Sequence, residues 1–366
     1  MAVLNINSPE DWFEHASERR TAFMEKHCLS SMEGVTSDAA PRRFYRVKNE
    51  SDKTCILIES PPDHHPQSIA GHKLKDFIRL SIELREIGLS APEVYEEDLE
   101  KGYLLVEDFG DQKFNQVINN RPEKERELYR LAVQALVQLR DQGGALAQSC
   151  RPFYGGYLHK AHRQFIDWFV PFCIGRPIAD KEIEGFLKAW EKVEDALQPA
   201  PLGPMYVDYH IENLMYLPER EGVKQCGLLD FSMMYNGVPA YDIAHLTMDA
   251  RRTISKELRE ELVDIYVSGL SESDNQLYKK YISVMGMHFH VKVAGQIIRW
   301  IYEGKTGYMV HLPRVTGYIK EALPKPEFAP LKEFMDRNGI DMNKDLPLAS
   351  AKEIAPLIRE DAFLKS

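Results

Sequence analysis

The sequence predicts an α+β protein with a strand-rich N-terminal part and a mostly helical remainder. Short runs of β-branched and aromatic residues indicate strands before residue 110. From Pro122 onward, apolar residues recur at the spacing of helices. A polar strand–turn–strand unit at 205–231 interrupts the helical part. A chain of 366 residues is long enough to bury a large core and to form two lobes.

The N-terminal part is expected to begin with a helix. Residues 8–10 (Ser-Pro-Glu) supply an N-cap, a first-turn proline and an acid at the positive end of the helix dipole. An amphipathic helix is expected to begin at Leu74 and to end near Gly88. The runs that predict strands are 42–47, 54–58, 93–95 and 103–106.

The helical part shows several periodic segments. Residues 128–139 carry the 3, 4, 7, 8 and 11 spacing of a buried helix stripe. Further helices are expected at 159–175, 180–197 and within 256–303, and another begins at Tyr241 and runs to Arg251. The aromatic stripe within 159–175 favours a core position, because aromatic side chains dominate cores by area.

The hairpin at 205–231 carries the chemistry. Leu214–Leu217 and Cys226–Leu229 are short apolar strands around a polar turn, so Asp208, Asn213 and Asp230 lie at one end of the hairpin. Two carboxylates and an amide offer the oxygen ligands that Mg²⁺ prefers. Phosphoryl transfer needs a metal clamp on the phosphates and a carboxylate to orient the attacking hydroxyl. An Asp–Asn turn alone carries no chemistry, but order and spacing together favour a kinase catalytic loop.

Three stretches around this hairpin resemble the aminoglycoside phosphotransferase/choline kinase superfamily. They are Asp208–Met215, Gly227–Phe231 and Gly237–Ala244. Five more stretches make the chain similar to the bacterial cell-wall amino-sugar kinases, which phosphorylate the anomeric hydroxyl of N-acetylmuramate and N-acetylglucosamine. These are Arg42–Val47, Leu104–Gly110, Asp249–Arg252, Gly304–Tyr308 and Leu312–Val315.

The resemblance implies a bilobal protein-kinase-like fold. Residues 1–106 would form a small β-rich N-lobe, 107–111 a hinge and 112–366 a helical C-lobe. It also implies ATP or GTP as phosphate donor, Mg²⁺ as metal and an amino sugar as acceptor. Asp208 would orient the acceptor hydroxyl and accept its proton, while Asn213 and Asp230 would hold Mg²⁺.

The expected phosphate-binding region departs from the superfamily pattern. The turn before residue 42 has no glycine-rich loop, and Ser37 and Asp38 within it are the expected nucleotide contacts. Ile58 stands where a phosphate-binding Lys is expected. Guanidinium groups can grip phosphate with two hydrogen bonds, so the expected replacement cations are Arg42, Arg43 and Arg46. Solvent-exposed strand arginines are an equally good interpretation of each one singly.

The expected hinge contains Glu107 and Phe109, and its main chain is expected to read the nucleotide base. Two residues have expected structural roles. Tyr206 replaces the His that the superfamily places two residues before the catalytic Asp, and its hydroxyl can still donate to a main-chain carbonyl. Asp242 corresponds to an acid that hydrogen-bonds the catalytic loop in the superfamily.

The acceptor site is the least specified part of the sequence. His210 either contacts the acceptor or supports the loop, and the residues leave both roles open. Other candidates for acceptor binding come from the inserted helices and from a late polar break; they are Arg163, Asp167, Lys305 and Arg314. Ser232 follows the Asp-Phe pair where amino-sugar kinases commonly have Gln, which bears on acceptor identity.

Composition limits the partners. A formal net charge of −10 gives no electrostatic basis for binding nucleic acid or an anionic membrane surface. No stretch approaches the 18 apolar residues of a membrane span, and no apolar leader begins the chain. Five scattered cysteines without C-x-x-C spacing suggest reduced thiols and a cytoplasmic location. The expected partners are a nucleotide and a small-molecule acceptor, and the oligomeric state is not predicted.

Three alternatives remain open at this stage. The chain could phosphorylate a different acceptor, such as choline, ethanolamine or an aminoglycoside. Ile58 and Tyr206 motivate a pseudokinase that binds nucleotide without transferring phosphate. A helical interaction module with a polar but inert hairpin is the third.

Overall fold

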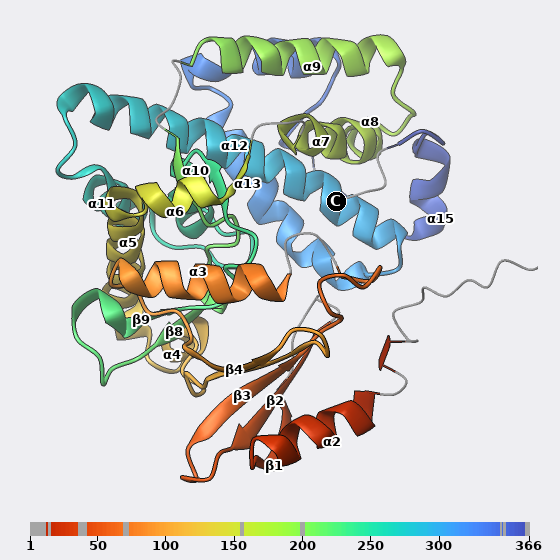
Figure 1. The fold of residues 1–366 in the computed structure, drawn as a ribbon. Coiled ribbons are helices and arrows are strands. Elements are labelled where there is room, and N and C mark those ends of the chain that lie inside the picture. Colours follow the sequence, from red (N-terminus) through yellow and green to blue (C-terminus); the bar gives the residue numbers. More distant parts are fainter. Residues whose placement is uncertain are drawn as a thin grey trace, which may run out of the picture. The chain divides into compact units, whose positions relative to one another are not determined.

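The structure is a computed structural model. It describes residues 12–13, 16–35, 42–68, 73–153, 157–197, 202–344, 346 and 349–362. Figure 1 shows its helices and strands coloured along the sequence. The chain divides into two compact units. The first unit comprises Met1–Cys150 and Tyr206–Met234, and the second comprises Arg151–Met205 and Tyr235–Ser366. The predicted division into lobes at residues 106 and 112 remains a prediction.

The first unit is built on a five-stranded antiparallel sheet with the order β1-β2-β3-β5-β4. Its strands are β1 (Ser30–Val35), β2 (Arg43–Lys48), β3 (Thr54–Glu59), β4 (Val94–Asp98) and β5 (Tyr103–Glu107). Alternate side chains of the central strands face helix α2 (Ala16–Lys26), whose Phe23 packs among Val47, Leu57 and Leu105. This apolar layer forms the core of the sheet.

A buried ionic group fixes α2 on the same sheet. The Glu59 side chain at the end of β3 is fully buried. Arg20 of α2 donates from Nη1 to Glu59 Oε1 and Oε2 at 3.1 and 3.0 Å. The hydroxyls of Tyr103 and Tyr45 donate to the same carboxylate at 2.9 and 3.3 Å. A buried carboxylate with these partners is compensated, and removal of one partner would leave it costly.

Helices complete the first unit. They are α3 (Leu74–Glu86), α4 (Phe114–Asn120), α5 (Glu125–Gln142) and α6 (Gly144–Ser149). The start of α3 is capped from a distance, because Asp63 Oδ1 and Oδ2 accept the main-chain N–H groups of Leu74 and Lys75 at 2.7 and 3.1 Å. The carboxylate satisfies N–H groups that a helix leaves without intrahelical partners.

The hairpin predicted from the sequence also belongs to the first unit. Strand β8 (Leu214–Tyr216) pairs with β9 (Cys226–Leu228), with Leu214 opposite Leu228 and Tyr216 opposite Cys226. Both strands are buried. The polar turn between them, residues 218–225, contains a short 3-10 turn at Gly222–Gln225.

The second unit is mainly helical and contains a small sheet of order β6-β10-β7. Its strands are β6 (Arg151–Pro152), β7 (Gly203–Met205) and β10 (Tyr235–Gly237). Its helices are α7 (Tyr157–Gln164), a π-helical turn (Phe165–Phe169), α8 (Val170–Ile174), α9 (Asp180–Asp195), α10 (Ala240–Thr247), α11 (Lys256–Val267), α12 (Glu272–Tyr302), α13 (Leu312–Ala322), α14 (Ala329–Arg337) and α15 (Ala351–Ile354).

Helix α12 forms the centre of the second unit. It is 31 residues long and buried on most of its circumference, as expected for a core helix. At Gly295 a side chain would come within 2.1 Å of the Gln164 carbonyl oxygen, so only glycine allows this close crossing of the main chain. The predicted aromatic stripe is buried beside this crossing, with Phe165, Trp168 and Phe169 at most 1% exposed.

Most predicted strands and helices match these elements, while the predicted helix start at 8–10 lies outside the described residues. Strand β1 was not predicted, because it is an edge strand with every residue exposed and therefore no buried alternation. The short elements α4, α6, β6, β7 and β10 were not predicted either. The predicted polar break is wrong from Leu312 onward, where helix α13 begins with Pro313 in its first turn. Helix α10 ends at Thr247 rather than Arg251, where Asp249 Oδ1 instead accepts the Arg251 N–H at 2.8 Å in a turn. Within the described residues, no helix has the length and apolar character that a membrane span requires.

Candidate active site

The hairpin brings Asn213 and the residues next to Asp230 together. Beyond the paired strands, the Leu229 N–H donates to the Asn213 carbonyl at 3.0 Å. This bond extends the ladder by one step, so Asn213 and Asp230 emerge from the same end of the hairpin. Asp208 stands five residues before Asn213 on the loop that enters β8, and all three belong to the first unit.

Hydrogen bonds within the loop orient Asn213. Its Nδ2 lies 3.1 Å from the Asp208 carbonyl and 3.2 Å from His210 Nε2. Because an amide nitrogen can only donate, Nε2 of His210 accepts in this arrangement. The amide oxygen of Asn213 is thereby directed away from the loop, where it can serve as a ligand.

His210 and Asp208 differ in exposure. The His210 side chain is only 6% exposed, and its Nε2 lies 3.5 Å from Asp208 Oδ1. The Asp208 side chain is 48% exposed and so remains accessible to a substrate hydroxyl. The His210 ring is therefore buried within the loop, while the Asp208 carboxylate is half-exposed.

The backbone is strained directly beside both acids. Val207, immediately before Asp208, has φ +80°, and Asp230 itself has φ +59°. A β-branched residue rarely adopts positive φ, and such strain persists only where the surroundings enforce it. Strained residues of this kind cluster at functional sites, which supports a functional role for this loop.

Two aromatic side chains hold the segment around Asp230. The Tyr206 hydroxyl donates to the Leu229 carbonyl at 2.5 Å, and its ring is fully buried. Phe231 is also buried and packs against Phe77 of α3 with ring centroids 4.9 Å apart. The residues on both sides of Asp230 are thus fixed to the loop that carries Asp208 and to α3.

Arg42 is the predicted cation that the structure associates with Asp230. Its side chain is buried, and burial lowers its pKa to about 10, opposed by attraction to the carboxylates of Asp230 and Asp63. The guanidinium therefore stays charged at neutral pH. Since Asp63 caps α3, Arg42 belongs to a polar group that joins the start of β2, α3 and the Asp230 segment.

The other two arginines have different surroundings. Arg46 donates from Nε to Asp108 Oδ2 at 2.7 Å and from Nη2 to Asp111 Oδ1 at 2.9 Å. Its guanidinium is therefore bound by two acids of the predicted hinge. The Arg43 side chain is 49% exposed, and its guanidinium stacks over the Phe13 ring at 4.2 Å. The predicted contacts at Ser37 and Asp38 lie outside the described residues.

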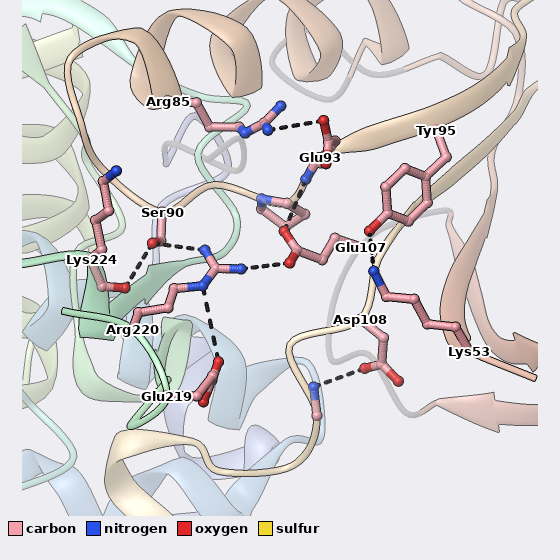
Figure 2. A network of polar contacts seen from close by, with 12 residues as sticks. Lys53, Arg85, Ser90, Glu93, Tyr95, Glu107, Asp108, Glu219, Arg220 and Lys224 are labelled. Carbon is pink, nitrogen blue, oxygen red and sulfur yellow. Dashed lines mark hydrogen bonds and ion pairs between the residues drawn. The ribbon is translucent and has the colours of Figure 1, made fainter.

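The predicted hinge, residues 107–111, joins β5 to the segment before α4. Glu107 Oε1 accepts a hydrogen bond from Arg220 of the hairpin turn at 2.5 Å (Figure 2). Arg220 also lies over the Phe109 ring, 5.0 Å from its centroid. Arg220 was not among the predicted site residues, because an Arg in a charged loop carries no local signal of its partner.

The predicted acceptor-binding residues all lie in the second unit except His210. Arg163 Nε donates to the buried carboxylate of Asp167 at 2.8 Å, an ion pair across one helical turn. Lys305 is exposed, with its Nζ 3.8 Å from Glu303. Arg314 donates to the Ala250 carbonyl at 2.7 Å.

The predicted structural acid, Asp242, is buried in the first turn of α10 in the second unit. The structural role of Asp242 and the acceptor-binding roles of the other residues therefore stay predictions.

The donor set at the hairpin fits a Mg²⁺ ion held jointly with nucleotide phosphates. Among the described residues, no three His, Cys, Asp or Glu side chains are arranged to bind a metal. One carboxylate from Asp230 and one amide oxygen from Asn213 match the few protein ligands that Mg²⁺ takes beside phosphates and water.

Comparison with known proteins supports this chemistry. A family model described as "Phosphotransferase enzyme family" matches residues 31–274. The chain is 26% identical over 362 residues to an N-acetylmuramate/N-acetylglucosamine kinase of Caulobacter vibrioides, which covers 88% of this chain and 97% of that protein. A Pseudomonas aeruginosa protein of the same name is 28% identical over 317 residues, covering 82% of this chain and 86% of its own.

Solved structures show the same fold. A choline kinase from Cryptosporidium parvum has a TM-score of 0.59 at 11% identity and covers 87% of this chain and 99% of its own. A choline/ethanolamine kinase family protein from Mesorhizobium loti has a TM-score of 0.56 at 13% identity, covering 88% and 99%. The predicted kinase-like α+β fold and the predicted resemblance are both confirmed by these matches.

Proposed function

The chain belongs to the phosphotransferase enzyme family, and from that premise we propose that it transfers the γ-phosphate of ATP to a hydroxyl of N-acetylmuramate or N-acetylglucosamine. The acceptor assignment is supported by the match to N-acetylmuramate/N-acetylglucosamine kinases over 82% to 88% of this chain. Structural similarity to choline kinases at 11% to 13% identity supports the fold but does not indicate which acceptor is used.

Asp208 is the proposed catalytic base. Its carboxylate is half-exposed. The Asn213 amide holds the loop by donating to the Asp208 carbonyl, and Val207, directly before Asp208, has positive φ. A carboxylate in this position orients the acceptor hydroxyl toward the phosphate and accepts its proton as the new P–O bond forms. Alignment supplies most of the rate in such a reaction, so the rigidity of the loop matters more than an elevated pKa.

Asn213 and Asp230 are the proposed Mg²⁺ ligands. When bound, Mg²⁺ would neutralise phosphate charge that develops during transfer. The protein's own contribution is to hold the two oxygen ligands in place, through the Asn213–Leu229 ladder bond and the Phe231–Phe77 packing.

The hinge and Arg42 are the proposed nucleotide-binding elements. The main chain at Glu107 and Phe109 would read the base. Arg42 is buried and charged near Asp230, which favours it over Arg43 and Arg46 as the cation for the phosphates. Arg46 would act on the hinge instead, because Asp108 and Asp111 occupy its guanidinium.

The predicted acceptor contacts at Arg163, Asp167, Lys305 and Arg314 remain proposals. We also propose a cytoplasmic location, supported by five cysteines that are all free thiols in the structure.

A phosphate-transfer screen tests the proposal. The purified chain with Mg²⁺ would be offered ATP and GTP against N-acetylmuramate, N-acetylglucosamine, choline, ethanolamine and an aminoglycoside, with ADP or GDP release measured by a coupled assay. We expect turnover with one or both amino sugars, and phosphorus NMR of the product identifies the modified hydroxyl. Transfer to choline or an aminoglycoside alone would overturn the acceptor assignment. Nucleotide binding without transfer to any acceptor would favour a pseudokinase.

A further inference from the structure

The turn of the catalytic hairpin reaches the hinge through one side chain. Arg220, in the turn at 218–225, donates from Nη2 to Glu107 Oε1 at 2.5 Å and from Nη1 to Ser90 Oγ at 2.8 Å (Figure 2). Ser90 in turn donates to the Lys224 carbonyl at 2.7 Å, on the same hairpin turn. The guanidinium therefore joins the turn, the segment before β4 and the end of β5.

Phe109 of the hinge lies between this guanidinium and strand β9. Arg220 is 5.0 Å above the Phe109 ring centroid, a cation–π distance. On β9, a Cβ added at Gly227 would come within 2.9 Å of Phe109 Cδ2, so the ring packs directly against the glycine. Any larger residue at Gly227 would displace the ring.

Two main-chain hydrogen bonds also connect the hairpin to this region. The Leu228 N–H donates to the Ser90 carbonyl at 2.7 Å, and the Tyr216 N–H donates to the Gln112 carbonyl at 2.7 Å. Strand β9 is thus bonded to the segment before β4, and β8 to the residue that follows the hinge. Arg220 adds two side-chain contacts to these bonds: a charged hydrogen bond to Glu107 and a cation–π contact with Phe109.

The Glu107 side chain is fully engaged in these contacts, but main-chain groups of the hinge remain available for hydrogen bonds to a ligand. Glu107 Oε1 accepts from Arg220, and Oε2 is 3.4 Å from the Glu93 N–H. Within the described part of the chain, no hydrogen bond uses the main-chain N–H or C=O of Phe109. These are the groups that a nucleotide base could pair with, and their position depends on the Phe109 ring.

We propose that Arg220 is a positioning residue for the nucleotide: it fixes Glu107 and Phe109 so that the hinge main chain is preorganised for the base. The inference rests on the proposed kinase function. The Arg220 guanidinium adds a side-chain connection to the main-chain bonds between the hairpin that carries Asn213 and Asp230 and the segments near the hinge. Arg220 touches neither phosphate nor acceptor in this role, so its loss acts on nucleotide affinity and leaves the chemical step intact.

The test compares Arg220→Ala and Arg220→Lys with a matched control, Arg79→Ala. Arg79 is also partly exposed and belongs to the same unit, where it pairs with Asp76 and Glu83 of α3 and contacts Ser149. KM for ATP, KM for the amino sugar and kcat would be measured well below the melting temperature, and the Kd for Mg-ADP by calorimetry.

For Arg220→Ala we expect KM for ATP and Kd for ADP to rise about tenfold, the scale of one lost charge-assisted hydrogen bond. Arg220→Lys keeps the charge but not both hydrogen bonds, and a rise of about threefold is expected. The acceptor KM and kcat should stay within about twofold of wild type, and Arg79→Ala should lower the melting temperature without raising KM for ATP.

A lower melting temperature for Arg220→Ala with unchanged nucleotide affinity would make the residue merely structural and overturn the proposal. Equal losses in Arg79→Ala would do the same. If Arg220→Ala does not fold, Arg220→Lys decides, and an unchanged Kd for ADP in that variant overturns the proposal. If the wild type transfers phosphate to no acceptor, the proposed function fails, while ADP calorimetry still tests the role of Arg220 separately.

Discussion

Removal of the Tyr206 hydroxyl should weaken both the fold and the catalytic step. The hydroxyl donates at 2.5 Å to the Leu229 carbonyl, directly before Asp230, and the fully buried ring packs edge-to-face on Tyr209 at 5.1 Å. Tyr206→Phe keeps the ring and deletes this hydrogen bond. The Leu229 carbonyl then loses its donor in a region where water access is poor.

The magnitude follows from that geometry. A buried acceptor that loses its partner costs about 1–3 kcal/mol, so the free energy of unfolding should fall by about 1–2 kcal/mol. The strained backbone of Asp230, with φ +59°, would be less firmly held. Since about 1.4 kcal/mol of lost alignment lowers a rate tenfold, we expect kcat to fall about fivefold to tenfold.

Tyr103→Phe is the matched control. Its ring is also fully buried and its hydroxyl donates to the buried Glu59 carboxylate at 2.9 Å, but this bond touches neither the Asp208 loop nor the Asp230 segment. Urea unfolding and steady-state kinetics of both variants make the comparison. Tyr103→Phe should lose stability with kcat nearly unchanged. The reasoning is refuted if Tyr206→Phe keeps wild-type stability and kcat, or if both variants lose kcat equally.

Three further predictions concern the same unit. Arg20→Met should lower the free energy of unfolding by about 3 kcal/mol, because it removes the nearest cation from the buried Glu59 carboxylate. The loss should be clearly smaller in a Glu59→Gln background, as a double-mutant cycle by urea unfolding would measure. Burial raises the pKa of the Cys226 thiol from 9.0 to about 12. The stability that this pKa shift gives the fold is therefore complete below pH 9.0 and is lost as the pH rises toward about 12. The difference in free energy of unfolding between wild type and Cys226→Ala should shrink over that pH range. A constant difference would contradict the shift. Arg42→Met should raise KM for ATP about tenfold, whereas the half-exposed Arg43→Met should change it less than about twofold, and equal effects would contradict the assignment of Arg42.

The hairpin could be predicted because its signals are local. The strands around residues 214–217 and 226–229 are short apolar runs with a polar turn, and the structure pairs them with Leu214 opposite Leu228. Period and turn chemistry specify such a unit without reference to the rest of the chain. The Tyr206 hydrogen bond to a main-chain carbonyl follows the same logic, since a buried hydroxyl requires an acceptor.

The hinge contacts could not be predicted, because they depend on tertiary placement. Arg220 and Glu107 are separated by 113 residues, and each is an ordinary charged residue in its own segment. The three arginines near residue 42 illustrate the same limit. Alternation predicts that Arg42 and Arg46 share a face, yet it cannot say that Asp108 and Asp111 engage only Arg46. Long-range electrostatic partners are properties of the folded chain.

Phosphate transfer by Asp208→Asn tests the central claim most directly. Asparagine keeps the size and hydrogen-bonding reach of the side chain but cannot accept the proton of the acceptor hydroxyl. Transfer from ATP to the amino sugar should fall about 100-fold or more, while the calorimetric Kd for Mg-ADP stays within about twofold of wild type. Transfer at close to the wild-type rate in this variant would contradict the account.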